Sequence, residues 1–228
     1  MSNLISTLKQ MIDDVELYAD LLYVLPGSMR VGVELTDTGE TATLLIGEES
    51  GVEEGLVNPV FKITMTAGIL EKIMKREVDA FALAGRSHIK ETRPIDFEFI
   101  DSSRVNEAME AIKGLATFFF NPGRIKRREL RLGLAGEAHG ARPIPLVYWK
   151  GVRYAWYHVP AGKTLNEEGE KDPWPQAFVV LRGKGKILIE HEEFELQAQT
   201  VYYIPRNGTH QVHADEVVEL LWLAWDAE

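Results

Sequence analysis

Hydrophobic side chains in the first part of the chain follow the period of a helix and then that of a hairpin. Between residues 4 and 18 the apolar positions recur at spacings of one, three and four, which places them on one helix face. Pro26 and the glycine after it end this pattern. Two apolar segments, Met29–Leu35 and Thr41–Ile46, then flank a turn that contains Gly39, which predicts a β-hairpin.

The pattern between residues 59 and 118 switches several times between the two periods. The alternation of apolar and polar side chains at its start is typical of a half-buried strand, and helical spacing follows. The expected order is a strand, two helices, two short strands and a last helix, at residues 59–66, 69–74, 80–84, 88–90, 95–100 and 105–118. This order predicts an α+β N-terminal domain with helices on a small sheet.

From Pro143 onward the apolar positions alternate in short runs, and none has the length of a long helix. The runs are rich in aromatic and β-branched residues, and turn residues separate most of them. We expect strands at residues 152–159, 177–181, 186–189, 194–196, 201–204 and 217–225. This pattern predicts an all-β domain, a compact antiparallel barrel or sandwich.

The segment between the two patterns has the composition of a connector. Residues 121–142 hold six basic and two acidic side chains together with several glycines. We therefore predict a domain at residues 1–120, a basic linker at 121–142 and a second domain at 143–228. The basic side chains have three interpretations: contact with an acidic surface of this chain or a second subunit, guidance of an anionic lipid headgroup, or contact with a membrane surface.

Composition narrows the classes of function. The 228 residues include no cysteine, which excludes thiolate zinc sites, disulfides and a cysteine nucleophile. The 35 acidic against 25 basic side chains give a net charge of −10, which disfavours a nucleic-acid partner. No apolar run reaches the length of a transmembrane segment, and the N-terminus lacks the pattern of a secretory signal. The sequence thus predicts a cytoplasmic protein.

The N-terminal half resembles the sterol carrier protein type 2 family. The resemblance covers roughly residues 25–120 and is carried by Val60–Thr66, the helix that follows, and Asp79–Arg86. It implies an apolar tunnel between helices and sheet that holds a fatty-acyl chain or another lipid. The alternative is that the same apolar side chains pack against one another as an ordinary core. The candidate ligand-binding residues are Leu70, Ile73, Met74, Phe81, Met109, Ile112 and Phe118.

The C-terminal half resembles the cupin family, a double-sheet barrel, over about residues 150–225. The resemblance is carried by Pro160–Gly162, Gln176–Gly183, Leu196–Pro205 and His210. In the family, three histidines and a glutamate hold Fe, Mn, Ni or Zn. The resemblance therefore implies a divalent metal, held in this chain by whatever residues occupy those four positions.

This chain departs from the family at three of the four metal-binding positions. Gly183 fits the pattern, so Gln176 replaces the glutamate, and His210 is retained. The two histidine positions fall on Glu170 and Asp172, or on Gly169 and Lys171 with the alternative spacing. The candidate metal ligands are Glu170, Asp172, Gln176 and His210. The alternatives are that the acidic residues form a solvated loop and that the protein has no cofactor. His210 is also the candidate catalytic residue, as a general acid or base, with a structural hydrogen-bonding role as its alternative.

Two cavity-forming folds favour a binding protein. We expect an intracellular protein that binds a hydrophobic small molecule or acyl lipid in its N-terminal domain. Its cupin-like domain, with weak metal binding or none, would serve sensing or homo-oligomerisation, as a homodimer. The alternative is a metal-dependent enzyme of the cupin type that acts on an acyl or aromatic acid. A third hypothesis is an interaction module whose barrel mediates only oligomerisation.

Overall fold

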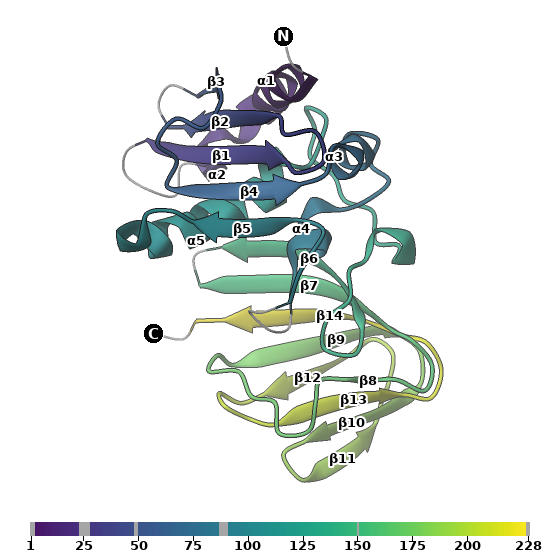
Figure 1. Ribbon diagram of the computed structural model, residues 1–228. Coiled ribbons are helices and arrows are strands. Elements are labelled where there is room, and N and C mark those ends of the chain that lie inside the picture. Colours follow the sequence, from purple (N-terminus) through teal and green to yellow (C-terminus); the bar gives the residue numbers. More distant parts are fainter. Residues whose placement is uncertain (1–2, 23–27, 48–49, 87–90, 150, 227–228) are drawn as a thin grey trace. The chain divides into compact units, whose positions relative to one another are not determined.

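A computed structural model describes residues 3–22, 28–47, 50–86, 91–149 and 151–226 (Figure 1). The chain forms two compact units. Unit 1 comprises residues 1–84 and 92–129, and unit 2 comprises residues 85–91 and 130–228. The predicted fold class is confirmed, because helices and a mixed sheet make up unit 1 whereas unit 2 is built of two sheets.

Unit 1 is built on a five-stranded sheet of order β3-β2-β1-β4-β5. Its strands are β1 Met29–Leu35, β2 Thr41–Ile46, β3 Gly51–Glu54, β4 Phe61–Met65 and β5 Asp96–Phe99. The predicted hairpin joins β1 to β2, and Gly39 supplies the positive φ of 73° that its turn requires. Strand β4 pairs with β1 in parallel, which makes the sheet mixed. The strand expected at 88–90 lies outside the described residues.

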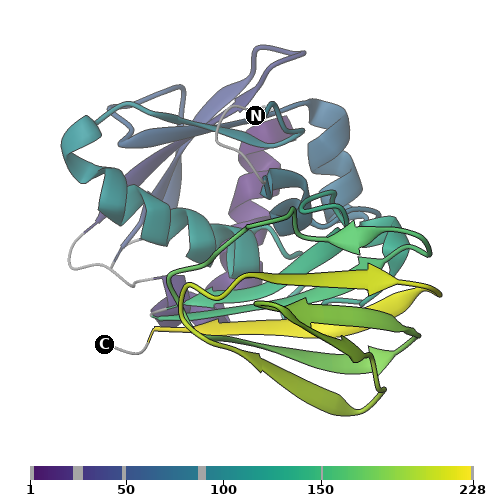
Figure 2. The ribbon, with the colours of Figure 1, turned by 90° about the horizontal axis from the view of Figure 1, so that it is seen from below.

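Helices cover one face of this sheet (Figure 2). They are α1 Asn3–Val15, α2 Ala19–Leu22, α3 Ala67–Met74, α4 Ala80–Ala84 and α5 Val105–Gly114, with single turns η1 Glu16–Tyr18 and η2 Ser102–Arg104. The helix predicted for 105–118 ends in a π-helical turn, η3 Leu115–Phe119. Apolar side chains at helical spacing meet the sheet, with Leu4, Phe61 and Phe119 almost fully buried.

The predicted ligand-binding residues of unit 1 are mostly core residues. Four of them are buried, namely Leu70, Ile73, Phe81 and Ile112, while Met74 and Phe118 are partly buried and pack against the core. Met109 is 43% exposed, so its expected place in a tunnel lining is wrong. Met109 lies on the solvent-facing side of α5, three residues before Ile112.

One cavity of unit 1 lies among residues of β4, β5, α4 and the α5–η3 helix. Its volume is about 10 Å³, and Ile112 is the only predicted ligand-binding residue that borders it. This is the space of about one water molecule, far less than an acyl chain fills. No helix in the described part of the chain has the length and apolar character needed to cross a membrane.

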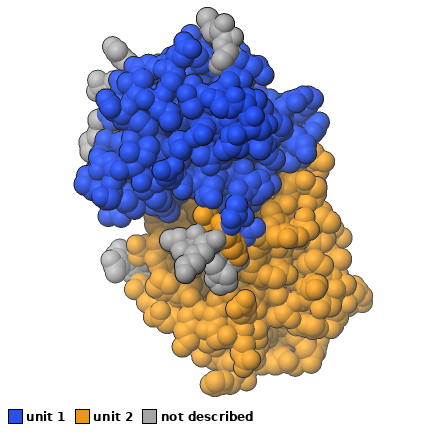
Figure 3. Space-filling view, in the orientation of Figure 1, with its two compact units in different colours: residues 1–84, 92–129 blue, residues 85–91, 130–228 orange. Residues whose placement is uncertain are grey.

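The segment predicted as a basic linker is divided between the units (Figure 3). Residues 121–129 belong to unit 1, where the backbone N–H of Gly123 donates to Asp14 and the guanidinium of Arg128 pairs with buried Asp79 at 2.5 Å. Residues 130–142 belong to unit 2 and include a short turn, η4 Leu132–Leu134. Hydrogen bonds and ion pairs thus tie the first part of the segment to unit 1.

Unit 2 consists of two antiparallel sheets of orders β12-β9-β14-β7-β6 and β11-β10-β13-β8. The strands are β6 Arg142–Trp149, β7 Val152–Val159, β8 Thr164–Leu165, β9 Gln176–Arg182, β10 Gly185–Ile189, β11 Glu192–Glu195, β12 Thr200–Ile204, β13 His210–Ala214 and β14 Val218–Trp225. Alternate side chains of each strand point inward, so Phe178, Ile187 and Leu220 meet in the core.

Candidate functional site

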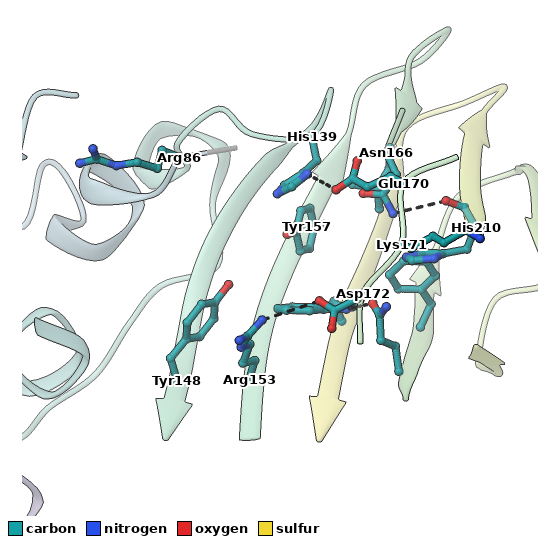
Figure 4. A pocket seen from close by; sticks show the side chains of 14 residues that line it. Arg86, His139, Tyr148, Arg153, Tyr157, Asn166, Glu170, Lys171, Asp172 and His210 are labelled. Carbon is teal, nitrogen blue, oxygen red and sulfur yellow. Dashed lines mark hydrogen bonds and ion pairs between the residues drawn. The ribbon is translucent and has the colours of Figure 1, made fainter. Parts of the chain in front are cut away.

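A pocket of about 280 Å³ opens within unit 2 (Figure 4). Inward-facing residues of β6, β7, β9, β13 and β14 border it, together with the loop 166–172 and Arg86 of the segment 85–91. Apolar and aromatic side chains such as Phe178 and Trp222 form part of the lining, and the remainder is polar or charged. The size and this mixed lining are those of a small-molecule site.

His210 borders the pocket from β13 and is 4% exposed. Its Nδ1 lies 3.1 Å from the carbonyl oxygen of Gly208. Because a carbonyl oxygen only accepts, Nδ1 carries the proton, and Nε2 of the neutral ring keeps its lone pair. Burial lowers the pKa of His210 below its usual value, although the bond to Gly208 opposes the shift. The neutral imidazole is therefore the favoured form near pH 7.

Gln176 is 2% exposed and forms a hydrogen bond with Trp222 on the neighbouring strand β14. The indole Nε1 of Trp222 donates to Oε1 of Gln176 at 2.5 Å. Since an indole N–H can only donate, this bond fixes which end of the amide faces Trp222. The Nε2 group of Gln176 is buried and has no hydrogen-bond partner. The pocket thus borders an amide whose donor is unsatisfied.

His139 and Glu170 form an ion pair at the pocket, with Nδ1 of the histidine 2.6 Å from Oε1 of the glutamate. The hydrogen bond to Glu170 raises the pKa of His139, although burial opposes the shift. Burial would raise the pKa of Glu170, but the hydrogen bond and the charge of His139 outweigh it and lower that pKa. The two shifts agree in favouring a charged pair.

A tight turn holds His139 in place. His139 and Gly140 both have positive φ, at 53° and 74°, and the flanking Ala138 and Ala141 exchange both backbone hydrogen bonds. These are the features of a two-residue type I′ hairpin turn. A side chain at Gly140 would overlap the carbonyl oxygen of Thr164, so glycine is required there. His139 is a non-glycine residue with a left-handed backbone conformation. Such a conformation costs free energy, and residues that adopt it are often found at functional sites.

The comparisons with known proteins divide the chain in the same way as its structure. The model of the family described as "Cupin domain" matches residues 155–225. Residues 155–225 form a cupin domain. No family model covers the N-terminal region, so its resemblance to the sterol carrier family stays a prediction. No curated protein matches the chain.

Three similar solved structures each cover less than half of this chain. A protein from Photorhabdus luminescens is 19% identical and covers 44% of this chain and 88% of its own, with a TM-score of 0.40. A "Cupin 2 conserved barrel domain protein" from Salinispora arenicola is 20% identical over 45% of this chain and 90% of its own, with a TM-score of 0.41. A conserved protein of unknown function from Streptococcus pyogenes is 18% identical over 47% and 93%, with a TM-score of 0.39.

The four predicted metal ligands of the cupin domain all border the pocket, but three of them, Glu170, Asp172 and Gln176, have oxygen atoms engaged elsewhere. Glu170 pairs with His139, and Oε1 of Gln176 accepts from Trp222. Asp172 accepts the backbone N–H of Trp174 through Oδ1 and lies 3.7 Å from Arg153 through Oδ2. Within the described ranges, no three acidic or histidine side chains are grouped so as to hold a metal ion. This donor set does not fit the metal that the cupin resemblance implies.

Two tyrosines complete the polar lining of the cupin pocket. Burial raises the pKa of Tyr148 to about 12 and raises that of Tyr157 well above its usual value, so both phenols keep their protons. The ring of Tyr157 lies 6.4 Å from that of Trp222. Arg153 stacks over Trp174, with its guanidinium carbon 4.2 Å from the ring centroid.

Sequence reasoning found one of the two pocket histidines and missed the other. His210 lies in a segment that matches the cupin pattern, and the structure places it at the pocket as expected. His139 stands in the segment taken for a linker, and its partner Glu170 is 31 positions away. The adjacent His139 and Gly140, flanked by alanines, were the available turn signal.

Proposed function

We propose that the cupin domain binds a small polar organic molecule through its own side chains, without the metal ion that the cupin resemblance implies. The observation that carries this proposal concerns the four positions at which the cupin family holds its metal: the residues that occupy them here and the contacts they make. They border a pocket of about 280 Å³, but two hold carboxylates and one holds an amide, and all four residues form hydrogen bonds or ion pairs within the chain.

The polar groups of the pocket support an organic ligand with hydrogen-bonding groups. Tyr157 borders the pocket, and burial raises the pKa of its phenol well above the usual value, so the hydroxyl keeps its proton and is a hydrogen-bond donor. His210 offers an acceptor at Nε2. A volume of about 280 Å³ suits a compact metabolite-sized molecule rather than a lipid.

Three further functions are proposed on fewer observations: an enzyme activity, binding of a hydrophobic molecule by unit 1, and homo-oligomerisation. The enzyme hypothesis is favoured by the lone pair of His210, which is poised to accept a proton from a bound substrate. Binding of a hydrophobic molecule by unit 1 stays a prediction, since the cavity described there holds about one water molecule. Homo-oligomerisation through the cupin domain also stays a prediction.

Elemental analysis and native mass spectrometry of untagged full-length protein test this proposal together. We expect less than one transition-metal ion in ten chains, and a mass shift that corresponds to a small molecule when one is retained. Addition of Mn²⁺, Fe²⁺, Ni²⁺ or Zn²⁺ should leave the thermal midpoint of the cupin domain unchanged. One tightly bound transition-metal ion per chain, lost in His210→Ala, would contradict the proposal.

A further inference from the structure

We propose that the cupin pocket binds a small aromatic carboxylate, and that Arg153 holds the carboxylate group. This inference rests on the proposed function and adds the chemical class of the ligand. Two features of the pocket carry it. One is a guanidinium group whose hydrogen-bond donors are open, and the other is an apolar lining made almost entirely of aromatic rings.

The guanidinium group of Arg153 borders the pocket and forms no hydrogen bond within the part of the chain that the structure describes. Its carbon lies 4.2 Å from the ring centroid of Trp174, and Nη1 lies 3.7 Å from Oδ2 of Asp172. The second distance is too long for a hydrogen bond. The side chain of Arg153 is 36% exposed, so a ligand can reach it. Because stacking uses only the face of the guanidinium, its edges stay available for two parallel hydrogen bonds to a carboxylate.

The loop that contacts Arg153 fixes the position of its guanidinium group. Asp172 and Trp174 both belong to this loop, and Oδ1 of Asp172 accepts the backbone N–H of Trp174. Pro175 follows, and its carbonyl oxygen accepts the backbone N–H of Trp225 at the end of β14. A guanidinium group held by such a loop loses little further freedom when it binds a carboxylate, which favours binding.

Charge at the pocket favours an anion over a cation. Arg86, Arg153 and Lys171 border the pocket, against Glu170 and Asp172. Each of the two carboxylates already lies beside a basic side chain, at 2.6 and 3.7 Å. The whole chain has a net charge of −10, so the excess of basic side chains is a local feature of the pocket.

The apolar part of the lining selects the body of the ligand. Among the described residues that border the pocket, Leu165 is the one aliphatic side chain, and the other apolar groups are the rings of Tyr148, Tyr157, Phe178 and Trp222. The ring centroids of Tyr148 and Tyr157 lie 6.1 and 6.4 Å from that of Trp222, at interplanar angles of 62° and 89°. Rings attract one another in this edge-to-face arrangement, so an aromatic ligand gains contacts that a saturated one does not.

Arg153 and the aromatic rings are neighbours on the inner face of one sheet. Tyr148 of β6 stands directly opposite Arg153 of β7 (Figure 4). Side chains paired in this way point to the same face of a sheet. The ring of Tyr148 is in turn in edge contact with Trp222. A ligand ring bound beside Trp222 can therefore direct a carboxylate substituent to Arg153.

Calorimetric titration of the full chain with benzoate, benzamide and cyclohexanecarboxylate tests the inference. Benzamide keeps the ring but lacks the charge, whereas cyclohexanecarboxylate keeps the charge but lacks the aromatic ring. Benzoate should bind at one site and about tenfold or more tightly than benzamide, because its hydrogen bonds with Arg153 join two charged groups. Its advantage over cyclohexanecarboxylate should be about threefold to tenfold, the contribution of an aromatic pair. Equal binding of benzoate and either of the other probes would overturn the inference.

Matched variants assign the carboxylate to Arg153. Arg153→Gln removes the charge and should weaken benzoate binding about tenfold or more, with benzamide binding unchanged. Arg153→Lys keeps the charge but loses the paired N–H groups, and should weaken benzoate binding by a smaller factor. Arg182→Gln removes the same charge at an exposed position outside the pocket and should leave binding unchanged. Unchanged benzoate binding by a folded Arg153→Gln protein would overturn the inference.

The imidazole NMR signals of His210, which borders the same pocket, separate failure of this inference from failure of the proposed function. If benzamide binds as tightly as benzoate and both shift the His210 signals, the inference is overturned and the proposed function stands. The same holds if the three probes leave these signals unchanged and glucose or malate shifts them. If none of these molecules shifts the signals at millimolar concentration, the inference and the proposed function both fail.

Discussion

The interiors of the two units are packed to different degrees. The cavity described in unit 1 measures about 10 Å³, whereas the pocket of the cupin domain measures about 280 Å³. In unit 1, aromatic and branched side chains such as Phe61 and Ile73 fill the space between sheet and helices. In the cupin domain, polar side chains such as Gln176 and His210 stand at equally buried positions and border the pocket. The apolar pattern of the sequence did not predict the difference in size between these two cavities.

The largest effect expected is the loss of core packing in unit 1. Phe61→Ala should lower the free energy of unfolding by about 3–5 kcal/mol, because a fully buried ring leaves a cavity. Helices occur in unit 1 and all five tryptophans lie in unit 2, so the helical CD signal should report this change. Phe99→Ala, on the paired strand but 40% exposed, is the matched control and should cost much less. Equal costs would show that the unit 1 core is loosely packed.

The turn that carries His139 gives the next largest effect. Gly140→Ala should destabilise the cupin domain by several times more than Gly162→Ala. Both glycines have φ near +73°, but only at Gly140 does a Cβ meet backbone atoms. The strained φ alone costs about 1–2 kcal/mol, which is the expectation for Gly162→Ala. Tryptophan fluorescence during urea unfolding measures both variants. Similar midpoints would mean that the turn does not depend on close contact with Thr164.

A smaller effect is expected from the ion pair of His139 and Glu170, and it depends on pH. The raised pKa of His139 gives stability that is present below pH 6.5 and is lost as the pH rises through its folded value. The lowered pKa of Glu170 gives stability that is present above pH 4.5 and is lost as the pH falls through its folded value. The coupling free energy between His139 and Glu170 should therefore be largest between pH 4.5 and pH 6.5, at about 1 kcal/mol.

A double-mutant cycle with His139→Gln and Glu170→Gln measures that coupling at several pH values. The pair of Lys186 and Glu193, 2.7 Å apart on β10 and β11, serves as the control, because its coupling should not change between pH 5 and 8. A His139–Glu170 coupling close to zero throughout this range would show that the histidine is not charged in the folded protein.

The smallest effect is expected at Met109, the predicted tunnel residue that the structure places at the surface. Met109→Gln should change the free energy of unfolding by less than about 0.5 kcal/mol, because an exposed side chain loses little packing. Ile112→Ala, one turn later and buried, should cost about 2–4 kcal/mol in the same helical CD measurement. A large loss at Met109 would place this side chain in the core after all.

Much of the fold followed from the periodicity of the sequence. The strands predicted at 152–159, 201–204 and 217–225 agree with β7, β12 and β14 to within one residue at each end. Strand β6 was missed because Pro143 and Pro145 interrupt its pattern. Its place at the edge of the sheet explains why two prolines are tolerated there.

The site was less predictable, because it depends on contacts between distant residues. His210 could be found because the segment around it follows the cupin pattern. The pairing of His139 with Glu170 and the orientation of the Gln176 amide depend on turns and registers that residue types do not specify. Similarly, nothing in the apolar spacing of Ile73 and Ile112 states whether neighbouring side chains fill the space between them.

The most direct test of the proposed function is an NMR titration of the full chain with a panel of small polar organic molecules, glycerol, glucose, malate and malamide. It observes the His210 imidazole and the methyl groups of Ile63 and Ile112 together. Both isoleucines border the small cavity of unit 1, and His210 borders the pocket of the cupin domain. We expect at least one probe to give saturable shifts of the His210 signals and to leave the isoleucine methyl signals unchanged. Shifts of the isoleucine methyls with an unchanged His210 would contradict it.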